Sequence, residues 1–97
     1  MNRQEILQSA IYTYGRSAQI KMLVEETAEL TQAICKYWRA GEDPEKLAIC
    51  YEAIREEMAD VQIMLDQAKI LFGPCELIED EKLLRLRARL EGEKNEV

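Results

Sequence analysis

Hydrophobic residues recur along the chain at intervals of three and four positions, the spacing of one face of an α-helix. The first such segment carries Ile6, Ala10 and Ile11 on one face, and Gly15 follows it as a stop signal. These features predict a helix over about residues 2–14. The chain shows no alternating pattern typical of a β-strand and no internal repeat, so the spacing favours an all-α fold.

Two further helices are bounded by residues with strong local preferences. Ser17 is suited to cap the N-terminus of a second helix, which is expected to end near Arg39. Asp43 followed by Pro44 combines an N-cap with proline at the first helical position, which predicts the start of a third helix. That helix can extend to Phe72, although its length allows a kink or a later start.

A Gly73-Pro74 pair separates the third helix from a fourth helical segment. The fourth helix is expected over about residues 76–90, and residues 91–97 are expected to fray. The sequence thus predicts one domain of four helices over residues 1–97, in which the second and third helices form an antiparallel hairpin.

Two pairs of carboxylates stand out within the predicted hairpin. Glu26 and Glu29 lie three residues apart in the second helix, as do Glu57 and Asp60 in the third. Residues at this spacing are neighbours on a helix surface, so each pair can converge on one point. An antiparallel hairpin would join the two pairs into a set of oxygen donors without nitrogen or sulfur. Such a set prefers Mg²⁺, with Mn²⁺ as an alternative.

The helix faces support this interpretation. Glu57 lies about 60° from the centre of the apolar stripe of the third helix, where a carboxylate is costly to bury without positive compensation. In the second helix, Glu26 and Glu29 lie opposite the main apolar face, on a side that also carries apolar residues. This predicts a helix packed between two layers, with its carboxylates in an interior cleft and Trp38 in the core. The main apolar face of the second helix consists of Ile20, Leu23, Val24, Thr27, Ile34 and Trp38.

Composition limits the chemistry further. Among its 97 residues the chain has 19 acidic and 13 basic side chains and no histidine. The absence of histidine excludes Ser-His-Asp and Cys-His catalysis and His-ligated zinc. A net charge of −6 argues against a nucleic-acid polymer as partner. In so acidic a chain, however, an isolated Glu-x-x-Glu pair is also typical of a solvated helix face.

The cellular setting is predicted from the cysteines and from hydropathy. Cys35, Cys50 and Cys75 are odd in number and widely spaced, which is typical of reduced thiols that pack as small hydrophobic residues. No segment is apolar over the length of a membrane span, and no apolar run of signal-peptide length begins the chain. We therefore expect a cytoplasmic protein without a membrane partner.

The two acid pairs are parts of a longer sequence pattern. Its parts are Gln19-x-Lys21-x-x-x-Glu25-Glu26-x-x-Glu29-Leu30, Glu56-Glu57-x-x-Asp60-Val61, the Leu65–Gly73 segment and Lys82-x-x-Arg85-Leu86-x-x-Arg89-Leu90. This pattern resembles that of the MazG-like all-α nucleoside triphosphate pyrophosphohydrolases and covers most of the chain. In that family an E-x-x-E pair precedes an E-x-x-D pair by a couple of dozen residues, and here 27 residues lie between Glu29 and Glu57.

The resemblance implies Mg²⁺-dependent hydrolysis of a (d)NTP at its α-phosphate, which gives the monophosphate and pyrophosphate, in nucleotide-pool housecleaning. It also implies homodimers or homotetramers, in which the hairpins of two chains pair into four-helix bundles. Glu25 becomes the candidate for orienting or deprotonating the attacking water. The metal ligands that the resemblance implies are Glu26, Glu29, Glu57 and Asp60.

Two roles are open for the basic residues. Under the resemblance, Lys82 and Arg85 contact the leaving pyrophosphate, with Lys21 as a further phosphate-binding candidate. Alternatively, Lys21 pairs with Glu25 one turn away, and the basic residues of the fourth helix pair with acids on the same helix. No residue is assigned to the base of the nucleotide.

Two other functions stay open at this point. A non-catalytic helical module would use an apolar helix face to bind a partner protein, and its acids would be solvated surface. A related pyrophosphohydrolase would act on a phosphoribosyl-linked nucleotide with a similar helical cluster of acids.

Overall fold

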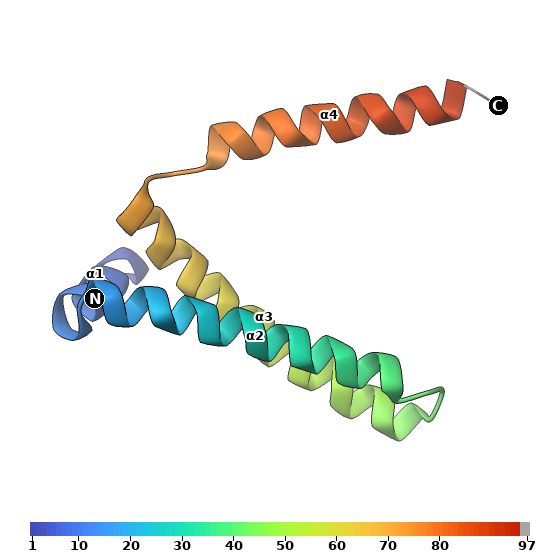
Figure 1. The fold of residues 1–97 in the computed structure, drawn as a ribbon, viewed down its shortest axis with the longest axis horizontal. Helices are drawn as coiled ribbons and strands as arrows, with labels where there is room; N and C mark the ends of the chain where they lie inside the picture. The colour runs from blue at the N-terminus through green and yellow to red at the C-terminus, as the bar shows by residue number, and fades with distance from the viewer. Residues whose placement is uncertain (96–97) are drawn as a thin grey trace.

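Four α-helices form this chain in a computed structural model that describes residues 1–95 (Figure 1). They are α1 (Arg3–Tyr14), α2 (Arg16–Arg39), α3 (Pro44–Phe72) and α4 (Glu76–Asn95). Residues 1–95 contain no β-strand. The all-α prediction is confirmed, and three of the four helices begin within one residue of the predicted positions.

Gly15 joins α1 to α2, and its position changes where α2 begins. The Asn2 side chain caps α1 by accepting a hydrogen bond from the Glu5 N–H at 2.8 Å. Gly15 has a φ of 91°, which favours glycine, and it serves both as the C-cap of α1 and as the residue before α2. Ser17 therefore lies inside the first turn of α2, and its predicted role as N-cap is wrong. The turn at Gly15 starts the second helix two residues early.

The helix α3 is continuous over 29 residues. The Asp43 side chain accepts a hydrogen bond from the Glu45 N–H at 3.0 Å, and Pro44 occupies the first helical position, as predicted. Gly73, with a φ of 106°, ends the helix. The start at Pro44 and the end at Phe72 are both as the sequence indicates, without the later start that its length allowed.

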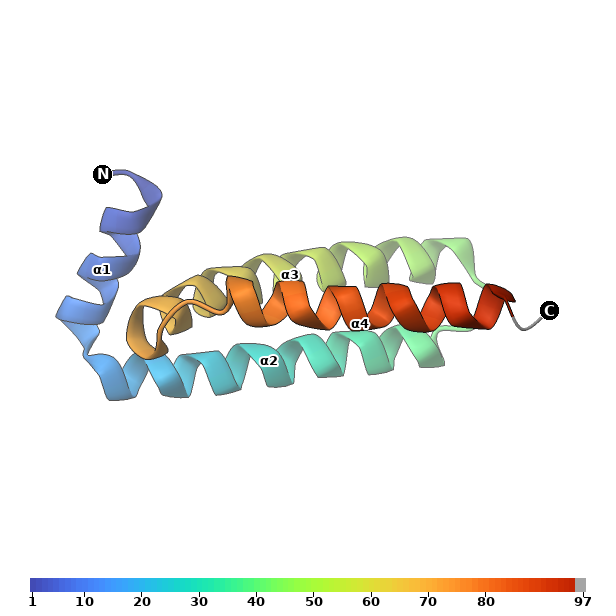
Figure 2. The same ribbon diagram turned by 90° about the horizontal axis from the view of Figure 1, so that it is seen from above.

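The core lies where α1 crosses one end of the α2–α3 hairpin (Figures 1 and 2). Leu7, Val61 and Met64 are buried there. Arg3 of α1 binds Asp66 of α3 at 2.7 Å, which fixes the position of α1 on the hairpin. No described side chain is completely buried, so this core is small for a chain of 97 residues.

One side of the hairpin, which we call the heptad face, is apolar and exposed. Residues seven positions apart lie on nearly the same face of a helix. The exposed apolar residues of this face are seven or fourteen positions apart within α2 and within α3. The predicted core position of Trp38 is wrong, because its side chain is 75% exposed. The exposed apolar residues of the heptad face are Val24, Trp38, Tyr51, Met58, Leu65 and Phe72.

The helix α4 packs against no other described helix (Figure 1). It continues to Asn95, so the predicted end near Leu90 is wrong; residues 96 and 97 lie outside the described part of the chain. Glutamates and a lysine around Gly92 are good helix formers, and one internal glycine costs only about 1 kcal/mol. All side chains from Leu77 to Glu93 are exposed.

The chain on its own is extended. Its radius of gyration is 17.8 Å, whereas a compact chain of this length has about 12.5 Å. Its solvent-accessible surface is 7870 Å², compared with about 5,700 Å² for a compact monomer of this mass. Within residues 1–95, no helix combines the length and the apolar character needed to cross a bilayer.

The cysteines are all free thiols, but their burial differs from the prediction. Cys35 and Cys50 are half-buried in the hairpin, in keeping with packing as small hydrophobic residues. Cys75 is exposed in the connection between α3 and α4, so for this residue the packing prediction is wrong.

Candidate metal centre

Three carboxylates from the two hairpin helices converge near the middle of the hairpin. Glu26 comes from α2, and Glu57 and Asp60 come from α3. One carboxylate oxygen of each lies within 4.8 Å of the other two. We call these three residues the acid cluster.

Glu26 reaches the cluster because the surface of α2 that packs on α3 includes this residue and overlaps only in part with the apolar face predicted as core. The residues of α2 that are buried or half-buried toward the hairpin include Gln19, Leu23, Glu26, Leu30 and Ala33. The predicted interior position of Glu26 agrees with this packing, because the residue is half-buried between α2 and α3. Its side chain lies in the helix interface, while the apolar face predicted as core contributes the exposed Val24 and Trp38.

The acid cluster is electrostatically uncompensated. The Oε2 atoms of Glu26 and Glu57 are buried and have no hydrogen-bond partner. Burial raises the pKa of Glu26, and the negative charges of Glu29, Asp60 and Glu57 raise it further. The pKa of Glu57 is likewise raised by burial first and then by the charges of Glu29 and Asp60. The ion pairs found among the described side chains involve none of these acids.

Glu29 stands beside the cluster instead of within it. It is exposed, and with Glu57 it borders a pocket of about 270 Å³ between α2 and α3. We call this side of the hairpin the acid side. Gln32 and Lys36 also line this pocket, although no motif in the sequence indicated them. They follow Glu29 by three and seven residues, and this spacing, which places all three on one helix face, could have indicated them.

The remaining candidates lie outside the cluster. Lys21 and Glu25 are exposed on α2, and no ion pair joins them in the described structure. Lys82 and Arg85 lie on α4, which touches the hairpin at its first turn, where Glu76 binds Lys69 of α3, but packs along neither hairpin helix. The predicted pairing of these two residues with acids on the same helix is not seen, and the ion pair within α4 is instead Arg87 with Glu91 at 3.5 Å.

The donor set of the acid cluster fits a magnesium ion. All its donors are carboxylate oxygens, the ligand type that Mg²⁺ prefers. With Mg–O distances of 2.0–2.1 Å, oxygens on opposite sides of the ion are about 4.2 Å apart, and one oxygen of each acid in the cluster lies within 4.8 Å of the other two. The two buried oxygens without partners are then the ones that a cation would satisfy.

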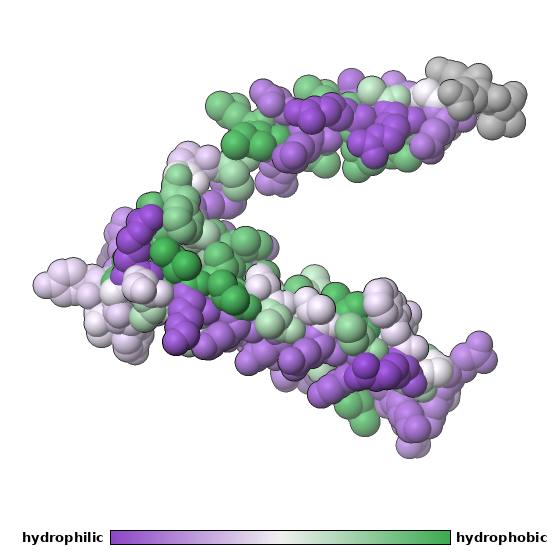
Figure 3. Space-filling model, in the orientation of Figure 1, coloured by the Kyte–Doolittle hydropathy of each residue, from purple (hydrophilic) through white to green (hydrophobic). Residues whose placement is uncertain are grey.

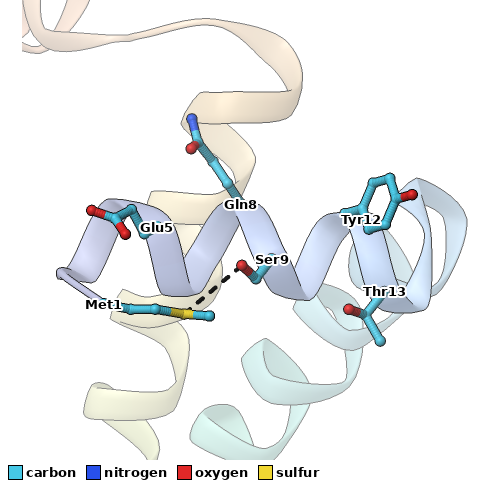
Figure 4. A pocket seen from close by; sticks show the side chains of 6 residues that line it. All are labelled: Met1, Glu5, Gln8, Ser9, Tyr12 and Thr13. Atoms are coloured by element: carbon cyan, nitrogen blue, oxygen red, sulfur yellow. Dashed lines mark hydrogen bonds between the residues drawn. The ribbon is translucent and has the colours of Figure 1, made fainter.

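A second pocket, on the outer surface of α1, offers no comparable chemistry (Figure 4). Its residues come from α1 and the preceding Met1, and Glu5 is its one charged side chain. The Ser9 hydroxyl donates to the Met1 sulfur at 3.9 Å. A single exposed carboxylate on one helix does not form a metal or phosphate site, so the acid cluster is the better candidate.

Comparisons of the chain with models of known protein families, with curated proteins and with solved structures found no match. The family resemblance therefore stays a prediction from the sequence motifs.

Proposed function

We propose that this chain is a Mg²⁺-dependent nucleoside triphosphate pyrophosphohydrolase, which hydrolyses a (d)NTP to the monophosphate and pyrophosphate. The observation that carries the proposal is the acid cluster, with its two buried carboxylate oxygens that no other group satisfies. Uncompensated carboxylates destabilise a fold, so their presence in a helix interface favours a role beyond packing. The free cysteines fit a cytoplasmic location.

Each acid has a proposed role. Glu26, Glu57 and Asp60 hold the metal, and Glu29 is the fourth ligand from the border of the adjoining pocket. Bound Mg²⁺ would offset the charge of the phosphates and increase the acidity of a coordinated water. Glu25 orients the attacking water and accepts its proton as oxygen bonds to the α-phosphorus. The bond from that phosphorus to the bridging oxygen breaks, and pyrophosphate leaves.

We further propose that two chains pair through the heptad face as a homodimer, alone or within a tetramer. The apolar side chains at seven-residue intervals suit a four-helix bundle. Two threonines on this face can be buried without loss of hydrogen bonds. Thr27 Oγ1 donates to the carbonyls of Leu23 and Val24, and Thr31 Oγ1 donates to that of Thr27.

Product analysis tests the reaction. The purified chain is incubated with a panel of (d)NTPs and Mg²⁺, and the products are separated by chromatography. We expect monophosphate and pyrophosphate, both absent when a chelator is added. Release of orthophosphate with diphosphate would mean that another bond is cut and would contradict the proposal.

The exposed heptad face also favours a second candidate, a non-catalytic module that binds a partner protein. This alternative predicts no turnover of any nucleotide and no effect of Mg²⁺ on thermal stability beyond that of matched ionic strength.

A further inference from the structure

The pocket on the acid side of the hairpin extends from the acid cluster toward the turn between α2 and α3. It has a volume of about 270 Å³, and Glu29 and Glu57 border it. Gln32 and Lys36 continue along the same face of α2, about 4.5 Å and about 10.5 Å beyond Glu29 along the helix axis. A nucleotide whose α-phosphate lies at the acid cluster can therefore extend its nucleoside into this pocket.

Half of the residues that line the pocket are small or apolar, and they come from both helices: Ala33, Ile49, Cys50 and Ala53. Ala33 is buried, and Cys50 and Ala53 are half-buried. Such a surface can contact the flat face of a heterocyclic base, whereas a phosphate would lose hydration there without compensation. The pocket is separate from the hydrophobic surface that Figure 3 shows around the carboxyl-terminal half of α3, because its α3 residues belong to the amino-terminal half.

The charges of the lining also favour an uncharged part of the ligand. Glu29 and Glu57 contribute two carboxylates and Lys36 contributes one ammonium group, so the lining as a whole is negative. Phosphates are attracted only where a metal ion offsets these carboxylates, which is at the acid cluster. The remainder of the pocket suits the neutral base of a nucleotide better than its phosphates.

Lys36 gives the pocket a preference among bases. None of the ion pairs among the described side chains involves Lys36, so its ammonium group is available to a ligand. An ammonium group donates hydrogen bonds and accepts none. It can bind the carbonyl oxygen of guanine, uracil or thymine, but it meets another donor at the amino group of adenine or cytosine. The amide of Gln32 carries a donor and an acceptor, so it can pair with either kind of base.

We infer that this pocket holds the base of the nucleotide and that Lys36 selects bases with a carbonyl oxygen over bases with an amino group. The inference rests on the proposed function for the presence of a nucleotide. It names the preferred substrates of that site as the triphosphates of guanine, uracil and thymine nucleosides. Lys36 is exposed, so it can be substituted without disturbing the helix interface.

Substrate selection tests the inference. The wild type should favour GTP over ATP and UTP over CTP by at least about tenfold in kcat/KM, the effect of one hydrogen bond from a charged donor. Lys36→Glu carries a carboxylate that accepts from an amino group, so it should reverse both preferences. Lys36→Gln can donate and accept, so it should abolish them. A wild type without these preferences, or variants that keep them, would overturn the inference.

Two controls separate base contact from charge. Lys46→Glu makes the same change of charge on an exposed residue of α3 that does not line the pocket, and it should keep the wild-type preferences. Inorganic tripolyphosphate has no base, so it should inhibit the wild type and Lys36→Gln nearly equally. If Lys36→Gln instead weakens this inhibition as much as it lowers kcat/KM for GTP, Lys36 contacts phosphate and the inference is wrong.

Binding of monophosphates distinguishes a failure of this inference from a failure of the proposed function. Isothermal titration calorimetry with Mg²⁺ measures the affinities for GMP, UMP, AMP and CMP. The wild type should bind GMP and UMP more tightly than AMP and CMP, and Lys36→Glu should reverse this order. If no triphosphate is hydrolysed but the reversal is seen, the proposed reaction fails and the base pocket stands. Equal affinities for the four monophosphates, or no binding of any, would overturn the base pocket even if triphosphates are hydrolysed.

Discussion

Carboxylates at two places on the same hairpin have opposite electrostatic environments. At the α1 end, Asp66 accepts hydrogen bonds from Arg3 at 2.7 Å and from Gln62 at 3.2 Å, and the Arg3 bond lowers its pKa. In the middle, Glu26 and Glu57 have raised pKa values and no cationic partner. The first arrangement stabilises the fold, whereas the second costs stability unless a cation binds. The difference separates a structural carboxylate from candidate ligands.

The largest expected difference is in turnover. Glu57→Gln removes a proposed metal ligand and should lower kcat/KM by at least about 10³-fold, the loss of several kcal/mol of transition-state stabilisation. The fold should remain intact, because the substitution also removes a source of repulsion. Asp66→Asn should leave kcat/KM within a few-fold of wild type and lower the melting temperature. Steady-state kinetics and thermal melts measure both.

The neighbouring Glu56→Gln variant is the matched control, since Glu56 is exposed on α3 outside the cluster. If Glu57→Gln unfolds while Glu56→Gln does not, Glu57 is a structural residue and its assignment as a ligand is wrong.

Magnesium should stabilise the middle of the hairpin. At ten times its dissociation constant, Mg²⁺ would add about 1.4 kcal/mol to the free energy of unfolding. For a domain of this size that is about 6–11 °C in melting temperature. The shift should disappear in Glu57→Gln and persist in Asp66→Asn. A shift of the same size with NaCl at equal ionic strength would show that screening, and not a site, is responsible.

The pH dependence should differ between the two groups. A raised pKa means that the folded chain holds more protons than the unfolded chain above the ordinary glutamate value of 4.5. Without metal, the contribution of Glu26 and Glu57 to stability therefore falls as the pH rises from about 4.5 through their raised pKa values. Urea unfolding across this pH range, in wild type and Glu26→Gln, should show a weaker decline in the variant. Parallel curves would contradict the raised pKa.

The smallest effect concerns the pair at the α1 end. Arg3→Ala should lower the free energy of unfolding by about 0.5–1 kcal/mol at neutral pH, because Arg3 is largely exposed. The pKa of Asp66 is lowered from 3.8, so this contribution is present above that value and is lost as the pH falls below it. Arg87→Ala, which removes an exposed pair within α4, is the control and should change stability less.

The sequence predicts the helices well because their boundaries are local. Gly15, Asp43 with Pro44, and Gly73 act on the backbone within a few residues, so no tertiary information is needed. The misplaced start of α2 and end of α4 are errors of a few residues at positions where capping signals compete or are weak.

The site was less predictable, because it depends on which faces pack together. The pairs Glu26 with Glu29 and Glu57 with Asp60 indicated, from spacing alone, the part of the hairpin where three of these four acids converge. The apolar face of α2 that was predicted as core is packed only in part, because Val24 and Trp38 on it are exposed. Periodicity reveals an apolar face but not the partner that covers it. The position of α4 was unpredictable for the same reason.

A Mn²⁺ titration followed by electron paramagnetic resonance shows directly whether the acid cluster binds a divalent cation. The signal of free Mn²⁺ reports the ions that are not bound. We expect saturable binding of at least one ion per chain by wild type and Glu56→Gln, with competition by Mg²⁺ and loss of the site in Glu57→Gln. Equal binding by all three proteins, or no saturable binding to the wild type, would contradict it.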